Sequence, residues 1–341
     1  KTDPFMQYAY IAAEEAMKQS GIKIEPERTG IVMGTAMAGI ATIAYTQEAL
    51  TGASHKKVGP RFIPKILGNI AAANIAIDYN IQGPSFTVST ACSSGGDAIN
   101  TACMCMQSGK ADIMLAVGAE SVLCPLVIYS LANAKALSRR NDSPSTASRP
   151  FDVTRDGFVI GEGGGALVLE TEEHALARGA KIYAEIRGCG NTDDAYHVTA
   201  PHPEGRGAIA CMKQAITEAG INPSDIGYIN AHGTATNKGD TVETSSIKKV
   251  FGNTLPYVSS TKGATGHMMG AGGITETITC VKAIETGTVP PTINLNEVDP
   301  ECAGIDFVAN TAKKAEINFA MSNAFGFGGQ NSSIIVGKYG K

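Results

Sequence analysis

Two stretches of the chain repeat one local pattern, and this repeat constrains the fold more than any other feature. Residues 88–96 read VSTACSSGG and residues 258–267 read VSSTKGATGH. In each, a short β-prone run leads into a turn of small residues and then into a helix. Strands and helices also alternate along the rest of the chain, which predicts parallel or mixed sheets covered on both faces. We therefore expect an α/β protein with two similar halves whose strand ends meet.

Local signals place several elements. Asp3 followed by Pro4 is typical of a helix start, and Gly21 is typical of its end. The apolar pattern predicts one continuous helix over residues 63–79 and a strand over residues 182–188.

Cys92 stands at the turn between a strand and a helix. Backbone N–H groups at a helix start carry partial positive charge, which favours a thiolate and can lower the pKa of a thiol. Small residues follow Cys92, so a substrate could approach it closely. Position favours a nucleophile over a buried structural thiol. Cys103 and Cys105 lie within the helical stretch, where a cysteine usually packs as a small hydrophobe.

Two histidines occupy similar places. His232 follows a strand in NAHGTAT and His267 follows another in STKGATGH. Both therefore lie at carboxyl ends of strands, where α/β sheets build their sites. A lone histidine there is often only a satisfied loop residue, but two in matching turns indicate chemistry. For Lys262, and for Glu243 and Glu276 on the following helices, the alternative is a solvated surface charge.

Composition excludes several classes of protein. The chain has 341 residues, a net charge of −4 and a pI near 5.9, which argues against a general nucleic-acid-binding protein. No apolar run reaches the length of a membrane span, and none opens the chain as a signal peptide would. The eight cysteines are dispersed through a long chain, which predicts free thiols and a cytoplasmic location.

Three apparent motifs do not hold. DVTRDGFVIGEG resembles a calcium loop, but Gly163 stands where the bidentate carboxylate is required. GEGGGALVLE leads into a strand, whereas a phosphate loop needs a helix start. His197 and His202 in HVTAPH have no matching cysteine pair for zinc. We expect no metal.

Four widely separated motifs carry a resemblance to a known family. They are TACSSG at Cys92, NAHGTAT at His232, KGATGHMMGAGG at Lys262 and His267, and NAFGFGGQN near the end. The chain resembles the β-ketoacyl-[acyl-carrier-protein] synthases of the elongating Cys-His-His type, most of all synthase II of bacterial type II fatty acid synthesis. Thiolases would show a second catalytic cysteine, and synthase III an asparagine in place of His267.

The resemblance implies a thiolase-like fold, with mixed sheets in a layered α/β/α/β/α arrangement. Residues 1–170 would form an N-terminal half carrying Cys92, without the leading strand found in relatives. Residues 171–341 would form a C-terminal half carrying His232 and His267. Two further departures, Gln330 for a common Thr and KGATGH for KSMTGH, remove no catalytic group.

The resemblance also implies the reaction, a decarboxylating Claisen condensation that uses no cofactor. Cys92 would accept an acyl group from acyl carrier protein. His232 and His267 would stabilise the enolate formed when malonyl-carrier protein loses carbon dioxide. Lys262 and Glu243 would position the rings, and the backbone N–H groups of Cys92 and Phe327 would hold the second oxyanion.

The remaining residues are carried over by position in the family motifs. Met37 and Leu131 would line the acyl pocket, Phe62 would reach the partner's pocket in a homodimer, and Phe327 would act as a gate. The malonyl side would be shaped or gated by Thr234, Thr236, Asp194 and Thr199. His55, Lys56, Lys57 and Lys135 would dock the acidic carrier protein.

Two alternatives stay open. A polyketide-type ketosynthase shares these motifs, and product analysis would separate it from a fatty acid enzyme. A non-catalytic partner subunit resembling a chain-length factor would have its nucleophile replaced, whereas Cys92 is intact.

Overall fold

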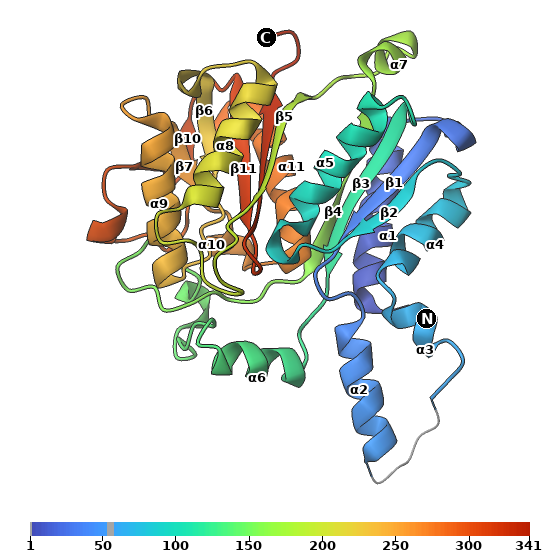
Figure 1. Ribbon diagram of the computed structural model, residues 1–341, viewed down its shortest axis with the longest axis horizontal. Coiled ribbons are helices and arrows are strands. Elements are labelled where there is room, and N and C mark those ends of the chain that lie inside the picture. The colour runs from blue at the N-terminus through green and yellow to red at the C-terminus, as the bar shows by residue number, and fades with distance from the viewer. Residues whose placement is uncertain (1, 53–57) are drawn as a thin grey trace.

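The computed structural model describes residues 2–52 and 58–341, and its elements form five layers. Two sheets alternate with three layers of helices, as Figure 1 shows from α9 and α8 on one side to α1 and α4 on the other. This is the layered α/β/α/β/α arrangement that was predicted.

The first sheet has the strand order β2-β1-β3-β4. Its members are β2 (Ser85–Val88), β1 (Thr29–Gly34), β3 (Ile113–Glu120) and β4 (Gly163–Glu170). β1 is parallel to both of its neighbours, whereas β3 and β4 are antiparallel. Every residue of β1 and β3 is buried, as expected for strands covered on both faces.

The second sheet repeats this order within a larger one, β5-β12-β11-β6-β7-β9. Its members are β5 (Glu185–Asp193), β12 (Gln330–Gly337), β11 (Phe319–Phe325), β6 (Ile226–Asn230), β7 (Tyr257–Ser259) and β9 (Asp306–Phe307). The series β7-β6-β11-β12 matches β2-β1-β3-β4 in order and direction. The expected pair of similar halves is therefore present, while the boundary at residue 170 stays a prediction.

The two sheets differ at one edge. β12 pairs with β5 on its outer side, but within residues 2–52 and 58–341 no strand pairs with the outer side of the equivalent β4. β5 runs to residue 193, beyond the strand predicted over 182–188, because its pairing with β12 continues that far. A small ribbon joins β8 (Thr288–Val289) to β10 (Lys313–Lys314).

Each helix layer closes one hydrophobic core. α1 (Pro4–Ser20) and α4 (Asn69–Tyr79) cover the outer face of the first sheet, and α8 (Arg206–Ala219) and α9 (Asn237–Phe251) cover that of the second. α5 (Ser94–Gln107) and α11 (Gly272–Thr286) fill the middle layer, where Ile99 and Ile274 belong to one buried cluster. The middle helices are those that follow the repeated strand–turn pattern.

Shorter helices lie around this frame. They are α2 (Ile40–Thr51), α3 (Phe62–Ile66), α6 (Pro125–Asn133), α7 (Glu172–Ala177) and α10 (Lys262–Thr265). Single 3₁₀ turns are η1 (Pro26–Arg28), η2 (Ala91–Ser93), η3 (Pro144–Thr146), η4 (Pro223–Asp225), η5 (Met269–Ala271) and η6 (Pro300–Cys302).

The helix boundaries that depend on local capping residues are predicted correctly. Asp3 caps α1 by accepting a hydrogen bond from Phe5 N at 3.1 Å, and Gly21 ends it at φ +60°. The single helix predicted over 63–79 is wrong, because Leu67 and Gly68 separate α3 from α4. The Ile66 carbonyl accepts from Gly39 N, a partner distant in sequence, so the helical bonding stops there.

Candidate active site

The three expected catalytic side chains meet at the carboxyl ends of strands from both sheets. Cys92 lies in η2 after β2, His232 follows β6, and His267 follows β7 and α10. His267 Nε2 lies 3.0 Å from Cys92 Sγ. The rings of His232 and His267 meet edge to face, with centroids 5.3 Å apart. The repeated strand–turn–helix pattern therefore places a thiol and two imidazoles in one cluster.

The turn that carries Cys92 is strained. Ala91 has φ +50°, a conformation that residues with a side chain rarely adopt. This turn is followed at once by α5, so the thiol sits beside the helix start with only 9% of the residue exposed. The sharp turn thus presents the sulfur to the interior of the site.

Glycines bring the two middle helices into backbone contact beside the site. A Cβ on Gly273 would lie 2.5 Å from Gly96 N, and one on Gly95 would lie 2.8 Å from Ile274 N. No side chain fits at either glycine without displacing the backbone of the other helix. The starts of α5 and α11, and with them Cys92 and the η5 turn, are therefore packed directly against each other.

The electrostatics of Cys92 differ from the expectation of a lowered pKa. Burial is the largest effect and raises the pKa of the thiol to about 11, although the Phe327 backbone amide and the Lys262 charge oppose it. The resting group is therefore a thiol. The helix start does not outweigh the loss of water, which could not be judged from sequence position.

Both histidines are neutral at ordinary pH. Burial, followed by the positive charge of Lys262, holds the pKa of each imidazole well below its usual range. Neither Nδ1 atom has a hydrogen-bond partner among the described residues. A neutral His267 can accept the proton of the Cys92 thiol through Nε2, and each ring can offer an N–H donor to a substrate oxygen.

Lys262 is a buried member of the site and not a surface charge. It is 2% exposed and forms an ion pair with Glu276 on α11, which is also buried. Burial raises the pKa of Glu276, and the Lys262 charge opposes that effect. The pair places the positive charge of Lys262 near Cys92, His232 and His267, and this charge lowers the pKa of all three groups.

Glu243 holds the backbone of the His232 turn. Its carboxylate accepts from His232 N at 2.8 Å and from Gly233 N at 2.7 Å. One helical turn earlier, Asp240 accepts from Ala235 N at 3.2 Å. Burial raises the pKa of Glu243 to about 7 and that of Asp240 to about 6. Neither acid is on a solvated helix face.

An apolar cluster surrounds the sulfur. Cys92 and Leu131 are both buried in it, and Met37 packs against it. Phe327 lies in the turn between β11 and β12 and is 39% exposed. Phe62 begins α3, is half-buried and is not part of this cluster. Within one chain, the structure brings Met37 and Leu131 to Cys92 but not Phe62.

The four residues expected on the malonyl side lie in two loops. Thr234 is buried, and its hydroxyl lies 3.1 Å from that of Thr236 in the loop after His232. Asp194 Oδ1 accepts from Asn331 Nδ2 at 3.0 Å, beside the turn of Phe327. Thr199 is exposed, in a loop that reaches the same turn where Gly328 N donates to Val198 O. Their roles in gating stay predictions.

The expected carrier-docking residues are only partly described. Lys135 is exposed after α6, in a left-handed conformation with φ +55°. His55, Lys56 and Lys57 lie outside the described residues.

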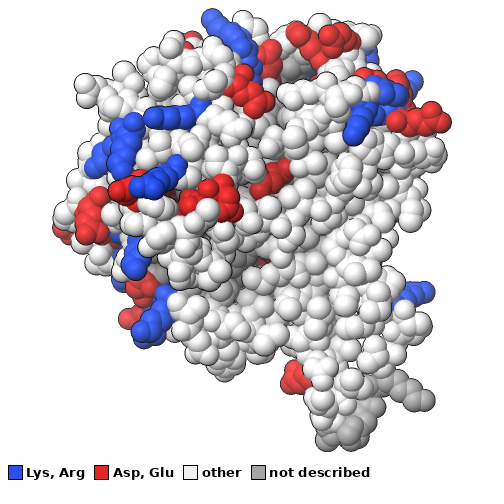
Figure 2. Space-filling view, viewed as in Figure 1, with Lys and Arg blue, Asp and Glu red and all other residues white. Residues whose placement is uncertain are grey.

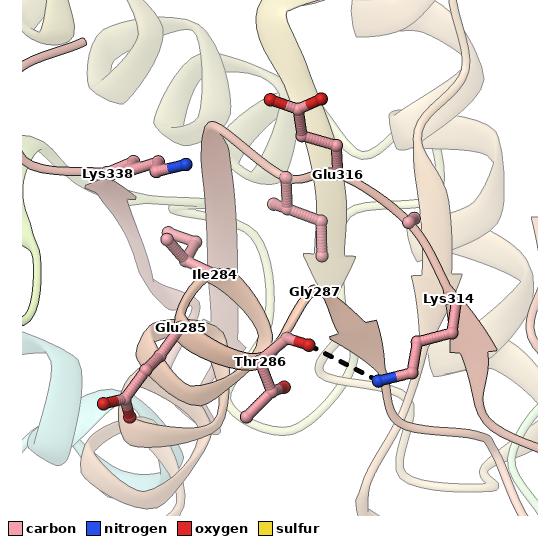
Figure 3. A pocket seen from close by; sticks show the side chains of 9 residues that line it. Ile284, Glu285, Thr286, Gly287, Lys314, Glu316 and Lys338 are labelled. Carbon is pink, nitrogen blue, oxygen red and sulfur yellow. Dashed lines mark hydrogen bonds between the residues drawn. The ribbon is translucent and has the colours of Figure 1, made fainter.

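Two cavities elsewhere are distinct from this cluster. A shallow pocket at the end of α11 is lined by Ile284, Glu285, Thr286, Gly287, Lys314, Ala315, Glu316, Ile317 and Lys338 (Figure 3). There Lys314 Nζ donates to Thr286 O at 3.5 Å. A cleft of about 900 Å³ runs along β4, α1 and residues 180–187. Neither is lined by Cys92, His232 or His267, so chemistry and not cavity size identifies the site.

Sequence reasoning missed two groups of buried charges. Arg155 donates to Asp299 at 2.6 Å and lies 3.5 Å from Asp240, which fixes the start of α9. Glu120 ends β3 with no exposed surface and accepts four hydrogen bonds. The sequence feature that could have indicated a buried role for Glu120 is its place at the end of the apolar run IMLAVGAE.

The donor atoms of Cys92, His232 and His267 lie within 4.8 Å of one another, a spacing that could also suit a soft metal ion. Metal-binding histidines usually donate their second ring nitrogen to an acceptor, and both Nδ1 atoms here lack one among the described residues. A thiol against one of two neutral imidazoles, beside backbone N–H donors, is the arrangement of a thiol-dependent condensing enzyme.

Comparisons with known proteins place the chain within that class. The model described as "Beta-ketoacyl synthase, N-terminal domain" matches residues 1–175, and "Beta-ketoacyl synthase, C-terminal domain" matches residues 183–296. The chain belongs to the β-ketoacyl synthase family.

Similar proteins agree with this assignment. The chain is 44% identical to 3-oxoacyl-[acyl-carrier-protein] synthase 2 of Rhizobium meliloti, over 99% of this chain and 82% of that protein. It is also 44% identical to the synthase 2 of Vibrio cholerae, over 98% and 82%. A β-ketoacyl synthase structure from Burkholderia phymatum superposes with a TM-score of 0.92 at 34% identity, covering 99% and 83%. The thiolase-like fold is confirmed.

Another similar structure is a type II polyketide acyl-carrier protein in complex with its ketosynthase, bound to the hexaketide. It has a TM-score of 0.91 and 35% identity, covering 98% of this chain and 85% of that one.

Proposed function

We propose that this chain is an acyltransferase that elongates fatty acyl chains by two carbons, condensing an acyl group on Cys92 with malonyl-acyl carrier protein. The observation that carries the proposal is the 3.0 Å contact between Cys92 Sγ and His267 Nε2, with the ring of His232 beside them. Membership of the β-ketoacyl synthase family and relatives named as synthase 2 support the substrate class.

The first step is transfer of the acyl group to the enzyme. Cys92 Sγ attacks the thioester carbonyl of acyl carrier protein, and the thiol proton passes to His267 Nε2. The carrier sulfur leaves and takes up that proton. His267 serves as base because its imidazole is neutral, and it removes the proton from a thiol whose pKa is about 11.

The second step is loss of carbon dioxide from the malonyl group. The electron pair left on carbon forms an enolate, whose charge gathers on the thioester oxygen. After acylation Nε2 of His267 no longer faces a thiol, so the proton of the neutral ring can exchange through solvent from Nδ1 to Nε2, and both rings can then present N–H donors to that oxygen. Burial and the Lys262 charge keep both imidazoles neutral, and Glu243 fixes the His232 turn.

The third step forms the carbon–carbon bond. The enolate carbon attacks the acyl carbonyl on Cys92, and the charge moves to that oxygen. The Phe327 amide, which opposes the rise of the Cys92 pKa, and the Cys92 amide are the donors that we assign to it. The bond to Sγ then breaks, which releases the β-ketoacyl carrier protein and restores the thiol after proton uptake.

Intact-mass analysis with acyl carrier protein tests this assignment. Wild type should gain one acyl group on Cys92, and Cys92→Ala should gain none. Cys103→Ser, a partly exposed thiol on the helix that follows, is the matched control and should acylate normally. His232→Ala and His267→Ala should lower malonyl decarboxylation roughly 10²–10³-fold, as loss of an oxyanion donor does. Normal decarboxylation in either histidine variant would overturn the assignment.

Carrier proteins are the proposed macromolecular substrates. The structure of a similar ketosynthase in complex with an acyl-carrier protein and the exposed cation of Lys135 support this. Lys135→Glu should raise KM for carrier-bound substrates and leave the rate with a small thioester unchanged. An equal effect on both substrates would place Lys135 outside the docking surface.

We also infer a homodimer that forms through β2. Within the described part of the chain β2 pairs only with β1, so its other edge is free. Phe86 on β2, Ile77 on α4 and Met104 on α5 are 49%, 75% and 52% exposed. Figure 2 shows few charged side chains over β2, α4 and α2. A second copy would cover this apolar face and continue the sheet.

No helix among the described residues is long and apolar enough to span a membrane. All eight cysteines are free, as predicted. The cytoplasmic location stays a prediction.

A further inference from the structure

We propose that Glu120 is a positioning residue, whose carboxylate fixes the loop after β1 and the turn after His267 in one place and so holds His267 against Cys92. The inference rests on the proposed function for the role of the triad. Glu120 itself touches neither the thiol nor the imidazoles.

The carboxylate joins three separate parts of the fold. Oε1 accepts from Thr35 Oγ1 and Met37 N, both at 3.1 Å, and Oε2 accepts from Ala36 N at 2.6 Å. Oε2 also accepts from Gly270 N at 3.1 Å. Glu120 ends a strand of the first sheet, whereas Gly270 lies in η5, which leads into the second-half helix α11. One side chain thus connects the two halves at the site.

These contacts favour an ionised carboxylate. The Thr35 hydroxyl accepts from Ala38 N at 3.2 Å and donates to Glu120 Oε1 at 3.1 Å. The other three groups are backbone N–H donors, which cannot accept, so a protonated Glu120 would have an acceptor only at Thr35, and only if that hydroxyl turned to accept. Burial raises the pKa of Glu120, and the backbone amides of Ala36 and Met37 are the largest opposing effects.

A buried charge of this kind is costly without a cation beside it. No ion pair among the described residues includes Glu120, and it has no exposed surface. The four donors alone hold it. A neutral side chain would be less costly at a purely structural position, so the charge itself calls for an explanation.

The two segments held by Glu120 both carry parts of the active site. Gly270 follows His267 by three residues, and a Cβ on it would lie 2.5 Å from Ala36 N and 2.8 Å from Glu120 Oε2. Met37, on the other held segment, packs against the apolar cluster that contains Cys92. The carboxylate therefore fixes the His267 turn and the wall of the acyl pocket relative to each other.

The charge also acts on the thiol. It raises the pKa of Cys92, as does that of Glu276, whereas Lys262 lowers it. His232 and His267, the other titratable groups at the thiol, are neutral. Removing the Glu120 charge should favour the Cys92 thiolate while it loosens the His267 turn. Because burial is the largest effect that raises the Cys92 pKa, unfolding would lower it too, so both measurements are made on variants shown to be folded by denaturant unfolding.

Two measurements test the proposal. The first is the pH dependence of Cys92 alkylation by iodoacetamide, followed by peptide mass analysis. The second is malonyl decarboxylation. In Glu120→Gln the amide nitrogen would face N–H donors, so decarboxylation should fall roughly 10²-fold, as for a misplaced catalytic group. The alkylation midpoint should move to lower pH by roughly half a unit or more.

Three variants provide controls. Glu120→Asp keeps the charge, so its alkylation profile should match wild type while decarboxylation falls. Thr35→Val removes one donor and keeps the carboxylate; it should lower decarboxylation less than Glu120→Gln, without an acid shift. Glu162→Gln is the matched carboxylate, because among the described residues Glu162 Oε1 accepts from Ser121 Oγ and Leu123 N, which lie on one segment. It should leave both measurements unchanged.

An unchanged or alkaline-shifted alkylation midpoint in folded Glu120→Gln would overturn the proposal, as would wild-type decarboxylation. If Glu120→Gln does not fold, normal decarboxylation in both Glu120→Asp and Thr35→Val would overturn it. If wild type alkylates at Cys92 but never decarboxylates malonyl-carrier protein, the proposed function fails, and the acid shift alone decides the inference.

Discussion

Lys262 and Glu276 are the pair of residues on which the charge balance of the site depends. Both are buried, and burial of the imidazoles, followed by the Lys262 charge, holds their pKa values well below the usual range. Removing one member of such a pair leaves an uncompensated buried charge, which costs more than the pair itself contributes. The pair therefore has separable effects on stability and on catalysis.

Lys262→Met should lower the free energy of unfolding by about 3 kcal/mol, because the Glu276 carboxylate stays buried without its cation. Lys262→Met combined with Glu276→Leu should recover most of that stability but not the decarboxylation rate, since the positive charge is still missing. Denaturant unfolding and malonyl decarboxylation measure the two effects. Equal stability of the single and double variants would show that the pair is not coupled.

At the scale of elements, α9 presents two acids to one loop. Asp240 and Glu243 lie one turn apart and hold the backbone of residues 232–235. Burial gives them pKa values of about 6 and about 7. Both values are raised above the ordinary values near 4 of the unfolded chain, so the folded state binds protons more readily.

This sets a direction for the pH dependence of stability. The contribution of these acids is fully present below about pH 4 and is lost as the pH rises through about 6 and 7. Glu243→Gln should flatten the decline between pH 5 and pH 7, whatever its effect on stability at a single pH. Denaturant unfolding across this range measures the slope. A slope equal to that of wild type would mean that Glu243 does not titrate there.

The elements also show how far sequence reasoning extends. Cys92, His232 and His267 could be found because each follows a strand, and strand ends meet. The break at Leu67 could not be found, because it depends on a hydrogen bond from Gly39, distant in sequence. Glu276 could equally be a solvated acid, because nothing local shows that it is buried, and the single local signal for Glu120 is its place at the end of the apolar run IMLAVGAE. Met37 was placed only by the family resemblance.

At the scale of the whole molecule, the proposed dimer supplies what one chain lacks. Phe62 does not join the apolar cluster at Cys92 of its own chain. The proposed face also carries apolar side chains that a monomer would leave in water, Phe86 among them. Dimer formation and completion of the acyl pocket should therefore fail together.

Phe86→Asp should reduce both the dimer fraction and the condensation rate, because it places a charge at the free edge of β2. Leu176→Asp on α7 is the matched control, since Leu176 is 55% exposed and lies away from β2. Sedimentation velocity at micromolar concentration and activity at the same concentration measure the two properties. A fully active monomeric Phe86→Asp would contradict the dimer proposal.

Because the two sheets have unequal edges, the backbone amides of the equivalent strands β4 and β12 should exchange hydrogen at different rates. β12 is hydrogen-bonded on both sides, whereas β4 is bonded on one side among the described residues and faces the cleft on the other. Alternate amides of β4 can therefore exchange in the native fold, whereas the amides of β12 exchange only when the sheet opens. In deuterium exchange followed by mass spectrometry, peptides from β4 should take up label in an earlier phase than peptides from β12. The two halves would then share one architecture but differ in the protection of their backbone hydrogen bonds against exchange.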